Sequence, residues 1–195
     1  MITDINQLDL NKQYTYADYL TWQFDERVEL IRGWISRMSP APLRKHQEVF
    51  GIVYNQIFNY LSGKNCKVYA APFDVRLINK RKKVEDQAIL SVVQPDISVI
   101  CDLEKLDDRG CLGSPDWIIE ILSPGNTRKE MKEKYSLYAE NGVREYWIVA
   151  PEYKNVQVYH LVNDEFILAD TYFEGDAIPV GIFEGFYIDS EKMFA

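Results

Sequence analysis

Two acidic residues stand inside otherwise apolar stretches of the chain. Asp96 heads the run PDISVI, and Glu120 is the one charged residue within WIIEILS. A carboxylate among isoleucine and tryptophan side chains is costly to bury unless another group pairs with it or binds it. Lys134 and Tyr138 follow in the segment KEKYSLY, four positions apart, and so share one face of a helix. Two carboxylates on neighbouring strands, with a lysine and a tyrosine on the next helix, indicate a metal-dependent site for phosphate chemistry.

Hydrolysis of a phosphodiester needs a nucleophilic water, positive charge on the phosphate and stabilisation of the leaving oxygen. Mg²⁺ can serve all three needs, and proteins hold it with one or two carboxylates plus waters and the substrate phosphate. Asp96 and Glu120 are 24 positions apart (120 − 96), which leaves room for a strand, a loop and the start of a second strand. If the strands pair, both carboxylates reach one ion, and the carbonyl of Ile121 could be a further ligand. Lys134 would add positive charge beside the phosphate or orient the attacking water, and Tyr138 would hold that lysine in place.

A structural explanation of the same residues stays open. Asp96 and Glu120 could be buried partners of Arg128 and Lys134 in an ion-pair cluster that has no catalytic role. Carboxylates at strand ends also occur in proteins without any function. Composition and spacing alone do not decide between the metal site and the cluster.

The elements before these residues must complete the site. Apolar and aromatic residues at helical spacing predict a short helix over 15–23. Two apolar runs within 28–40 surround Arg32 and Gly33 and predict a β-hairpin. Glu29 lies in the first strand of this hairpin, either as a solvent-facing residue or as a member of the site.

A strongly amphipathic helix is predicted over 44–61, with a stop at the following Ser-Gly pair. His46 falls in its first turn. A helix end can point into a cleft, so His46 is either a surface or capping residue or a part of the site.

The second half of the chain alternates β patterns with one further helix. The segments predicted as strands are 67–78, 91–103, 116–123 and 143–151. Pro72 in the first of them suggests an edge strand or a bulge, and 104–114 is expected to be a turn-rich loop. A helix is predicted from about 127 to 142, capped by Thr127 or Asn126. The remainder indicates an antiparallel meander with a closing helical turn, in which His160 has a structural role.

This order of elements predicts an α/β or α+β fold: a mixed sheet flanked by helices, with an additional antiparallel β region. A chain of 195 residues fits a single domain over 1–195 and can bury a substantial core. No internal repeat, low-complexity tract or linker divides it.

Composition excludes several classes of protein. A hydrophobic fraction of 47% and a charged fraction of 27% are ordinary for a globular protein and exclude disordered and fibrous chains. No apolar run is long enough to cross a membrane, and the first residues lack the features of a signal peptide, so a cytoplasmic protein is expected. Three cysteines without a CxxC pair predict neither a disulfide nor a thiolate zinc site; Cys66, Cys101 and Cys111 are expected to pack as small apolar residues.

The net charge of −8 is unusual for a protein that binds nucleic acid, because such affinity comes mostly from neutralising phosphates. Only two stretches are densely basic: 79–83 (NKRKK) and 127–134 (TRKEMKEK). Each could be no more than a solvated loop or helix face.

Several motifs together resemble a known family. The segments VELIRG, SPAPLRKHQ, QPDISVI, SPDWIIEILSPGNTR, KEKYSLYAENGVREYWIVAP and FEGFYIDSEKMF are similar to those of the Uma-two family of putative restriction endonucleases, of the PD-(D/E)XK nuclease superfamily. The resemblance runs from about Tyr14 to the last residues. It implies that Asp96 is the aspartate of the PD motif and Glu120 the acid of the (D/E)XK motif. It also points to Glu29 and His46 as the site positions of the N-terminal part.

The chain departs from the superfamily pattern at one position. The lysine expected two residues after the acid is absent, and Leu122 stands there. Lys134, in a KxxxY pattern with Tyr138, resembles the QxxxY helix motif of other nucleases in the superfamily, which implies that the lysine comes from the helix.

The resemblance implies a Mg²⁺- or Mn²⁺-dependent endonuclease that hydrolyses DNA, with no membrane partner and a homodimeric state. Asp96 and Glu120 would hold the metal, Lys134 would polarise the phosphate, and Tyr138, His46 and Glu29 would support them. One alternative is a non-catalytic module that binds nucleic acid or protein and keeps the nuclease fold. Another is a small-molecule hydrolase on the same scaffold, which the acidic net charge would favour.

Overall fold

A mixed six-stranded sheet, here called the central sheet, carries most of the core. The computed structural model describes residues 2–38, 43–80, 84–125 and 127–195. The central sheet has the order β12-β11-β10-β9-β6-β3. Its strands are β3 (Lys67–Ala70), β6 (Ile97–Ile100), β9 (Trp117–Ile121), β10 (Glu145–Ala150), β11 (Asn155–Val162) and β12 (Glu165–Phe173). β9 and β10 are parallel, and the other neighbours are antiparallel.

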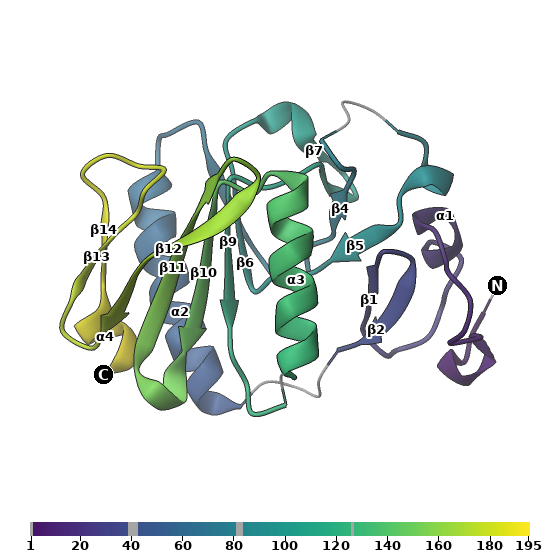
Figure 1. The fold of residues 1–195 in the computed structure, drawn as a ribbon, viewed down its shortest axis with the longest axis horizontal. Coiled ribbons are helices and arrows are strands. Elements are labelled where there is room, and N and C mark those ends of the chain that lie inside the picture. Colours follow the sequence, from purple (N-terminus) through teal and green to yellow (C-terminus); the bar gives the residue numbers. More distant parts are fainter. Residues whose placement is uncertain (1, 39–42, 81–83, 126) are drawn as a thin grey trace.

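Two long helices cover the two faces of the central sheet (Figure 1). Helix α2 (Arg44–Leu61) buries Val49, Val53, Ile57 and Leu61 against one face. Helix α3 (Arg128–Asn141) buries Leu137 and Tyr138 against the other. β9 and β10 lie in the interior of this sheet and are covered on both sides, which is why their sequences are apolar at successive positions.

A second six-stranded sheet lies on the far side of α3 from the central sheet (Figure 1). Its order is β2-β1-β5-β4-β8-β7. The strands are β1 (Val28–Ile31), β2 (Trp34–Arg37), β4 (Val75–Leu77), β5 (Ser91–Val93), β7 (Leu106–Asp107) and β8 (Gly110–Leu112). Ile31, Val75 and Val93 of this sheet share one buried cluster with Ile118 of β9 and Tyr138 of α3. Helix α3 is therefore packed between two sheets.

Local signals at the helix ends agree with the structure. Thr15 forms a capping box at the start of α1 (Tyr16–Tyr19), and the Thr127 side chain accepts the Glu130 amide at the start of α3. Gly142 ends α3 with φ +87°, a conformation that glycine adopts without strain. Asn126, the alternative cap, lies outside the described residues. The predicted helices and the β1–β2 hairpin are thus confirmed, except that the first helix ends at Tyr19 and does not extend to residue 23.

The C-terminal part is antiparallel, as predicted. β10, β11 and β12 follow one another in the central sheet. They are followed by the two-stranded sheet of β13 (Ala177–Pro179) and β14 (Tyr187–Asp189) and by α4 (Ser190–Phe194). Short 3₁₀ helices occur at Ile5–Gln7, Asp86–Ala88, Leu103–Lys105 and Pro151–Tyr153. Within the described ranges, none of the helices combines the length and apolar character needed to cross a bilayer.

The prediction of one strand over 67–78 is wrong. The chain turns at Ala71 and Pro72, so that β3 pairs with β6 in the central sheet while β4 pairs with β5 and β8 in the second sheet. The segment 91–103 divides in the same way into β5 and β6, and the expected loop 104–114 contains the β7–β8 hairpin. Alternation of apolar residues continues across such crossings, so periodicity does not reveal where a chain changes sheets.

The expectation for two of the cysteines is also wrong. Cys66 and Cys101 form a disulfide, whereas Cys111 is free and buried as predicted. The antiparallel pairing of Lys67 with Ile100 places the two disulfide cysteines opposite each other at the next position. An odd cysteine count does not reveal strand pairing of this kind. The mixed α+β class, with sheets flanked by helices, is confirmed.

Candidate active site

Asp96 and Glu120 face each other across neighbouring strands. β6 and β9 pair through Ile97↔Ile119 and Ser98↔Ile118, so the next position of this register sets Asp96 opposite Glu120. Directly opposed side chains of an antiparallel pair have Cβ atoms about 5 Å apart. The amide of Ile121 donates a hydrogen bond of 2.8 Å to Asp96 Oδ2. The two carboxylates therefore lie on one face of the central sheet, the face that α3 covers.

Helix α3 brings a lysine and a tyrosine to the same carboxylate. Lys134 Nζ lies 3.1 Å from Glu120 Oε1, and the Tyr138 hydroxyl donates to the same oxygen at 2.6 Å. The two residues are one helical turn apart, and so both side chains point toward β9. Leu122 lies on the same strand face as Glu120 and packs against the cluster under α3.

Glu29 reaches the site from the second sheet. Its side chain is 1% exposed, and its Oε1 accepts hydrogen bonds from Lys134 Nζ at 3.0 Å and from the Gln94 amide at 2.8 Å. The solvent-facing alternative for Glu29 is therefore wrong. β1 is an interior strand of the second sheet, and α3 covers the face on which Glu29 lies.

His46 approaches Asp96 from the opposite face of the central sheet. It lies in the first turn of α2, and its Nε2 is 3.3 Å from Asp96 Oδ2. The ring is buried, and its Nδ1 has no hydrogen-bond partner among the described residues. Asp96 stands just before β6, at the end of the strand, where side chains from both faces can reach it. The structure thus brings together all six residues predicted for the site.

Charge at the site is unbalanced. The site contains three carboxylates, those of Glu29, Asp96 and Glu120, and one ammonium, that of Lys134, which pairs with Glu29 and Glu120. Burial raises the pKa of Glu120 to about 7; Lys134 opposes this shift, and the carboxylates of Asp96 and Glu29 add to it. Burial alone would lower the pKa of Lys134, but the carboxylates of Glu120 and Glu29 outweigh it and raise that pKa above its ordinary value. Burial also raises the pKa of the Tyr138 hydroxyl, which therefore stays a proton donor.

The ion-pair alternative accounts for only part of this arrangement. Lys134 does pair with Glu120, as that alternative expects. Arg128 is exposed, however, and forms no ion pair with either carboxylate. Asp96 is held by an amide and a histidine instead, which leaves more carboxylate charge than the described cations neutralise.

The donor set fits an oxygen-preferring divalent cation. Asp96 and Glu120 are each anchored through one oxygen, and the second oxygen of each accepts no hydrogen bond from a described residue. The two side chains are 23% and 14% exposed. Over the described ranges, no group of three or more His, Cys, Asp or Glu side chains could hold a metal ion. Mg²⁺ needs no such group, because one or two carboxylates with waters and a substrate phosphate suffice.

Sequence reasoning missed the groups that hold Glu29. The Gln94 amide donates to Glu29, and the Gln94 side chain donates to Asp74 Oδ1 at 2.8 Å. Burial raises the pKa of Asp74, and the hydrogen bond from Gln94 opposes that shift. Gln94 lies two residues before Asp96, between β5 and β6, and it contacts the site through its main chain. Residue type carries no signal for a main-chain contact, so no sequence pattern could have found it.

Comparison with known proteins gives three findings. A family model named Uma2 and described as "Putative restriction endonuclease" matches residues 16–191. The uncharacterised protein slr1290 of Synechocystis sp. is 24% identical over 151 residues, which are 75% of this chain and 74% of that protein. A crystal structure described as a putative nuclease belonging to DUF820, from Anabaena variabilis, superposes with a TM-score of 0.71 at 20% identity. It covers 93% of this chain and 97% of that one, so the two share a fold.

Proposed function

Because the chain belongs to the Uma2 family of putative restriction endonucleases, we propose that it is a Mg²⁺- or Mn²⁺-dependent endonuclease that hydrolyses DNA phosphodiester bonds. One observation carries the proposal. Asp96 and Glu120 face each other at the ends of neighbouring strands, with the Lys134 ammonium 3.1 Å from Glu120. Each carboxylate keeps one oxygen clear of the described hydrogen-bond donors.

Asp96 and Glu120 would hold the metal through their free oxygens. Mg²⁺ or Mn²⁺ there would supply positive charge for the phosphate and make a bound water more acidic. The Ile121 amide and His46 fix the orientation of Asp96, and Tyr138 fixes that of Glu120. Orienting partners of this kind usually matter for metal affinity nearly as much as the ligands do.

Lys134 would act as a fixed cation. Its raised pKa keeps it protonated, so it is suited to stabilising charge on the phosphate or holding the attacking water and unsuited to accepting a proton. Glu29 holds the ammonium from the opposite side to Glu120. The lysine at this site therefore comes from α3, while the strand position two residues after Glu120 is Leu122.

Cleavage of supercoiled plasmid tests the proposal. We expect the purified protein to nick the plasmid with Mg²⁺ or Mn²⁺ and not with EDTA. The cleavage rate should fall by more than about 100-fold in Glu120→Gln. The matched control is Glu174→Gln, since Glu174 pairs with Lys154 outside the site. Equal rates in Glu120→Gln and wild type would refute the proposed site.

A non-catalytic nucleic-acid or protein-binding module is the second candidate, favoured by Leu122 at the strand position of the superfamily lysine. The melting temperature with and without Mg²⁺ separates the two functions. A nuclease binds the ion at Asp96 and Glu120 and is stabilised by it. A pure binding module has no reason to bind Mg²⁺ at these carboxylates, and its melting temperature should not change.

A further inference from the structure

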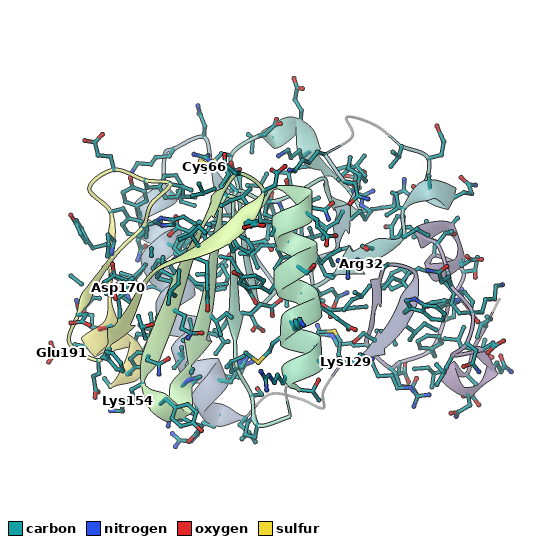
Figure 2. The ribbon with its side chains drawn as sticks, viewed as in Figure 1. Arg32, Cys66, Lys129, Lys154, Asp170 and Glu191 are labelled. Carbon is teal, nitrogen blue, oxygen red and sulfur yellow. A yellow bond between two sulfur atoms is a disulfide. The ribbon has the colours of Figure 1, made fainter. Side chains whose placement is uncertain are left out.

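A groove of about 770 Å³ runs between the β1–β2 hairpin and the first turns of α3. We call it the hairpin groove. Its hairpin wall carries Arg32, Trp34 and Arg37, and its helix wall carries Thr127 and Lys129 among others. Figure 2 shows Arg32 and Lys129 on the side of α3 that faces the hairpin. None of these residues belongs to the proposed metal site.

The hairpin wall combines an indole ring with an unpaired cation. The Trp34 side chain is 46% exposed. Its strand, β2, is an edge strand, so only β1 pairs with it in the second sheet. Arg37 is exposed and pairs with no described acidic residue. Arg32, by contrast, is tied to Glu140 at 2.6 Å. Trp34 lies on the face of the hairpin that carries Glu29 and Ile31, whereas Arg37 lies on the other face and lines the groove from the end of this edge strand.

The helix wall is mixed in charge. Lys129 is 84% exposed and lies 3.8 Å from Glu133, a loose pair that a phosphate could compete with. Glu130 and Glu133 also line the groove and would repel phosphates along this wall. Positive charge is therefore concentrated at Arg37 and at the first turn of α3, where the helix dipole adds to it.

The hairpin groove is built from the chain segments that carry the proposed site. Ile31 lines the groove and lies on the same face of β1 as Glu29. Gly125 lines it from the connection between β9, which carries Glu120, and α3. The hairpin groove therefore shares β1 and the β9–α3 connection with the proposed site.

We propose that the hairpin groove binds an unpaired stretch of nucleic-acid strand beside the scissile phosphate, with a base stacked on Trp34 and phosphates on Arg37 and Lys129. This inference rests on the proposed function, because it takes the scissile phosphate to lie between Asp96 and Glu120. The face of a base is open to an indole only where the base is unpaired. Single-strand binders combine stacking aromatics with a few cations, as this groove does.

The limited basic surface argues in the same direction. A duplex binder needs a broad basic face, whereas this chain has a net charge of −8 and two glutamates in the groove itself. A single strand that stacks on Trp34 draws part of its affinity from the indole and needs fewer phosphate contacts.

Binding is measured in EDTA, where cleavage cannot interfere, by fluorescence anisotropy of a labelled oligothymidine of about 15 nucleotides. Trp34→Ala should weaken binding by about tenfold or more, while Trp34→Phe should retain most of it, because a phenyl ring still stacks. Arg37→Glu should weaken binding and flatten its dependence on salt concentration, because a phosphate contact is lost. A duplex of the same length should bind more weakly and without dependence on Trp34.

Two matched controls lie away from the groove. Tyr153→Ala removes an aromatic ring that is 78% exposed, and Lys192→Glu reverses an exposed cation in α4. Both should bind the oligonucleotide as the wild type does. Melting temperatures of all variants establish that they are folded.

Unchanged affinity in Trp34→Ala and Arg37→Glu would overturn the inference, and so would equal losses in the two controls. The inference would also be overturned if the duplex bound more tightly than the oligothymidine and with the same affinity in Trp34→Ala as in the wild type. Plasmid cleavage is scored separately. Binding that depends on Trp34, with no cleavage in any divalent metal, would support the role of the groove and refute the proposed nuclease activity. Cleavage by a protein whose binding does not depend on Trp34 would support the nuclease activity and refute the role of the groove.

Discussion

Lys134 joins the two sheets at the candidate site. Its Nζ lies 3.0 Å from Glu29 on β1 and 3.1 Å from Glu120 on β9. Removing one member of a buried ion pair commonly costs about 3–5 kcal/mol, because the remaining charge is left without a partner. Lys134 therefore contributes both to stability and to the proposed chemistry, and an experiment must separate the two.

We predict that Lys134→Met abolishes plasmid cleavage while Mg²⁺ binding survives, because Asp96 and Glu120 are untouched. Cleavage must be assayed well below the lowered melting temperature of the variant, with Mg²⁺ binding followed as a shift in that temperature. Lys134→Arg should rescue poorly, since a planar guanidinium does not replace a compact ammonium between two carboxylates. Lys132→Met, an exposed lysine on the same helix, is the control and should cut as the wild type does.

A second substitution makes this prediction more specific. Leu122 shares a strand face with Glu120, so Leu122→Lys in the Lys134→Met background should restore part of the activity. The rescue should be partial, because replacing a half-buried leucine costs about 1–3 kcal/mol of stability. Cleavage by Lys134→Met at the wild-type rate would exclude Lys134 as the substitute for the strand lysine.

Individual residues of the site differed in how well the sequence predicted them. Asp96 and Glu120 stood out because a charge in an apolar run is costly, and Lys134 and Tyr138 because they share a helix face. Glu29 could be assigned to the site only from the contact between β1 and α3, and these two elements are distant in the sequence. Gln94 acts through its amide, and its residue type therefore carried no information.

The elements were predictable where their ends are marked locally. Helix α2 spans Arg44–Leu61 as its periodicity predicts, and α3 begins after the Thr127 cap and ends before Gly142. No local signal shows where the chain leaves the central sheet between β3 and β4. The alternation of apolar residues continues there while the pairing partner changes from β6 to β5. Pairing partners are a long-range property, and local periodicity does not contain them.

The β1–β2 turn gives a prediction at the scale of the element. Gly33 has φ +84°, and a Cβ there would lie 3.0 Å from the Gln13 Cβ and 3.2 Å from the Tyr14 carbonyl oxygen. Gly33→Ala should therefore lower the free energy of unfolding by about 1–2 kcal/mol, through left-handed strain and this crowding. Urea denaturation measures the change. Because this turn holds Glu29 and Trp34, oligonucleotide affinity should fall as well.

Gly51 provides the matched control. It lies in the middle of α2, and a Cβ there would meet nothing within 4 Å. Gly51→Ala should raise the free energy of unfolding by about 0.5–1 kcal/mol, because alanine favours the helix. Opposite signs for the two glycines are expected, and a gain of stability at both would contradict the assigned role of the Gly33 turn.

At the scale of the whole molecule, we predict a homodimer. β12 is a nine-residue edge strand of the central sheet, and Ile167, Leu168 and Phe173 on it are exposed. A long edge with apolar side chains invites pairing with another strand, and a second copy could pair with it across a two-fold axis. Light scattering should give about 45.6 kDa (2 × 22.8). Leu168→Lys should give the monomer mass. The control Leu10→Lys, at an exposed leucine far from β12, should keep the dimer mass. A monomeric wild type would contradict the prediction.

Stability of the whole molecule should also depend on the proton at Glu120. Its folded pKa, about 7, exceeds the ordinary value of 4.5, so the folded state binds this proton more tightly than the unfolded state does. The free energy of unfolding should therefore gain up to about 3 kcal/mol from this group as the pH falls through 7 toward 4.5, and lose it as the pH rises again. The difference between wild type and Glu120→Gln in EDTA isolates this contribution, because other groups titrate in both proteins.

A divalent cation should reverse the direction of this pH effect. The metal binds the ionised carboxylate and competes with the proton, so the Mg²⁺-induced rise in melting temperature should be larger at pH 8 than at pH 6. Glu120→Gln should lose most of the rise at both pH values, and Glu174→Gln should keep it. Chemical denaturation with and without Mg²⁺ checks the same linkage at constant temperature. A rise that is independent of pH, or equal in Glu120→Gln and wild type, would place any bound metal away from Asp96 and Glu120.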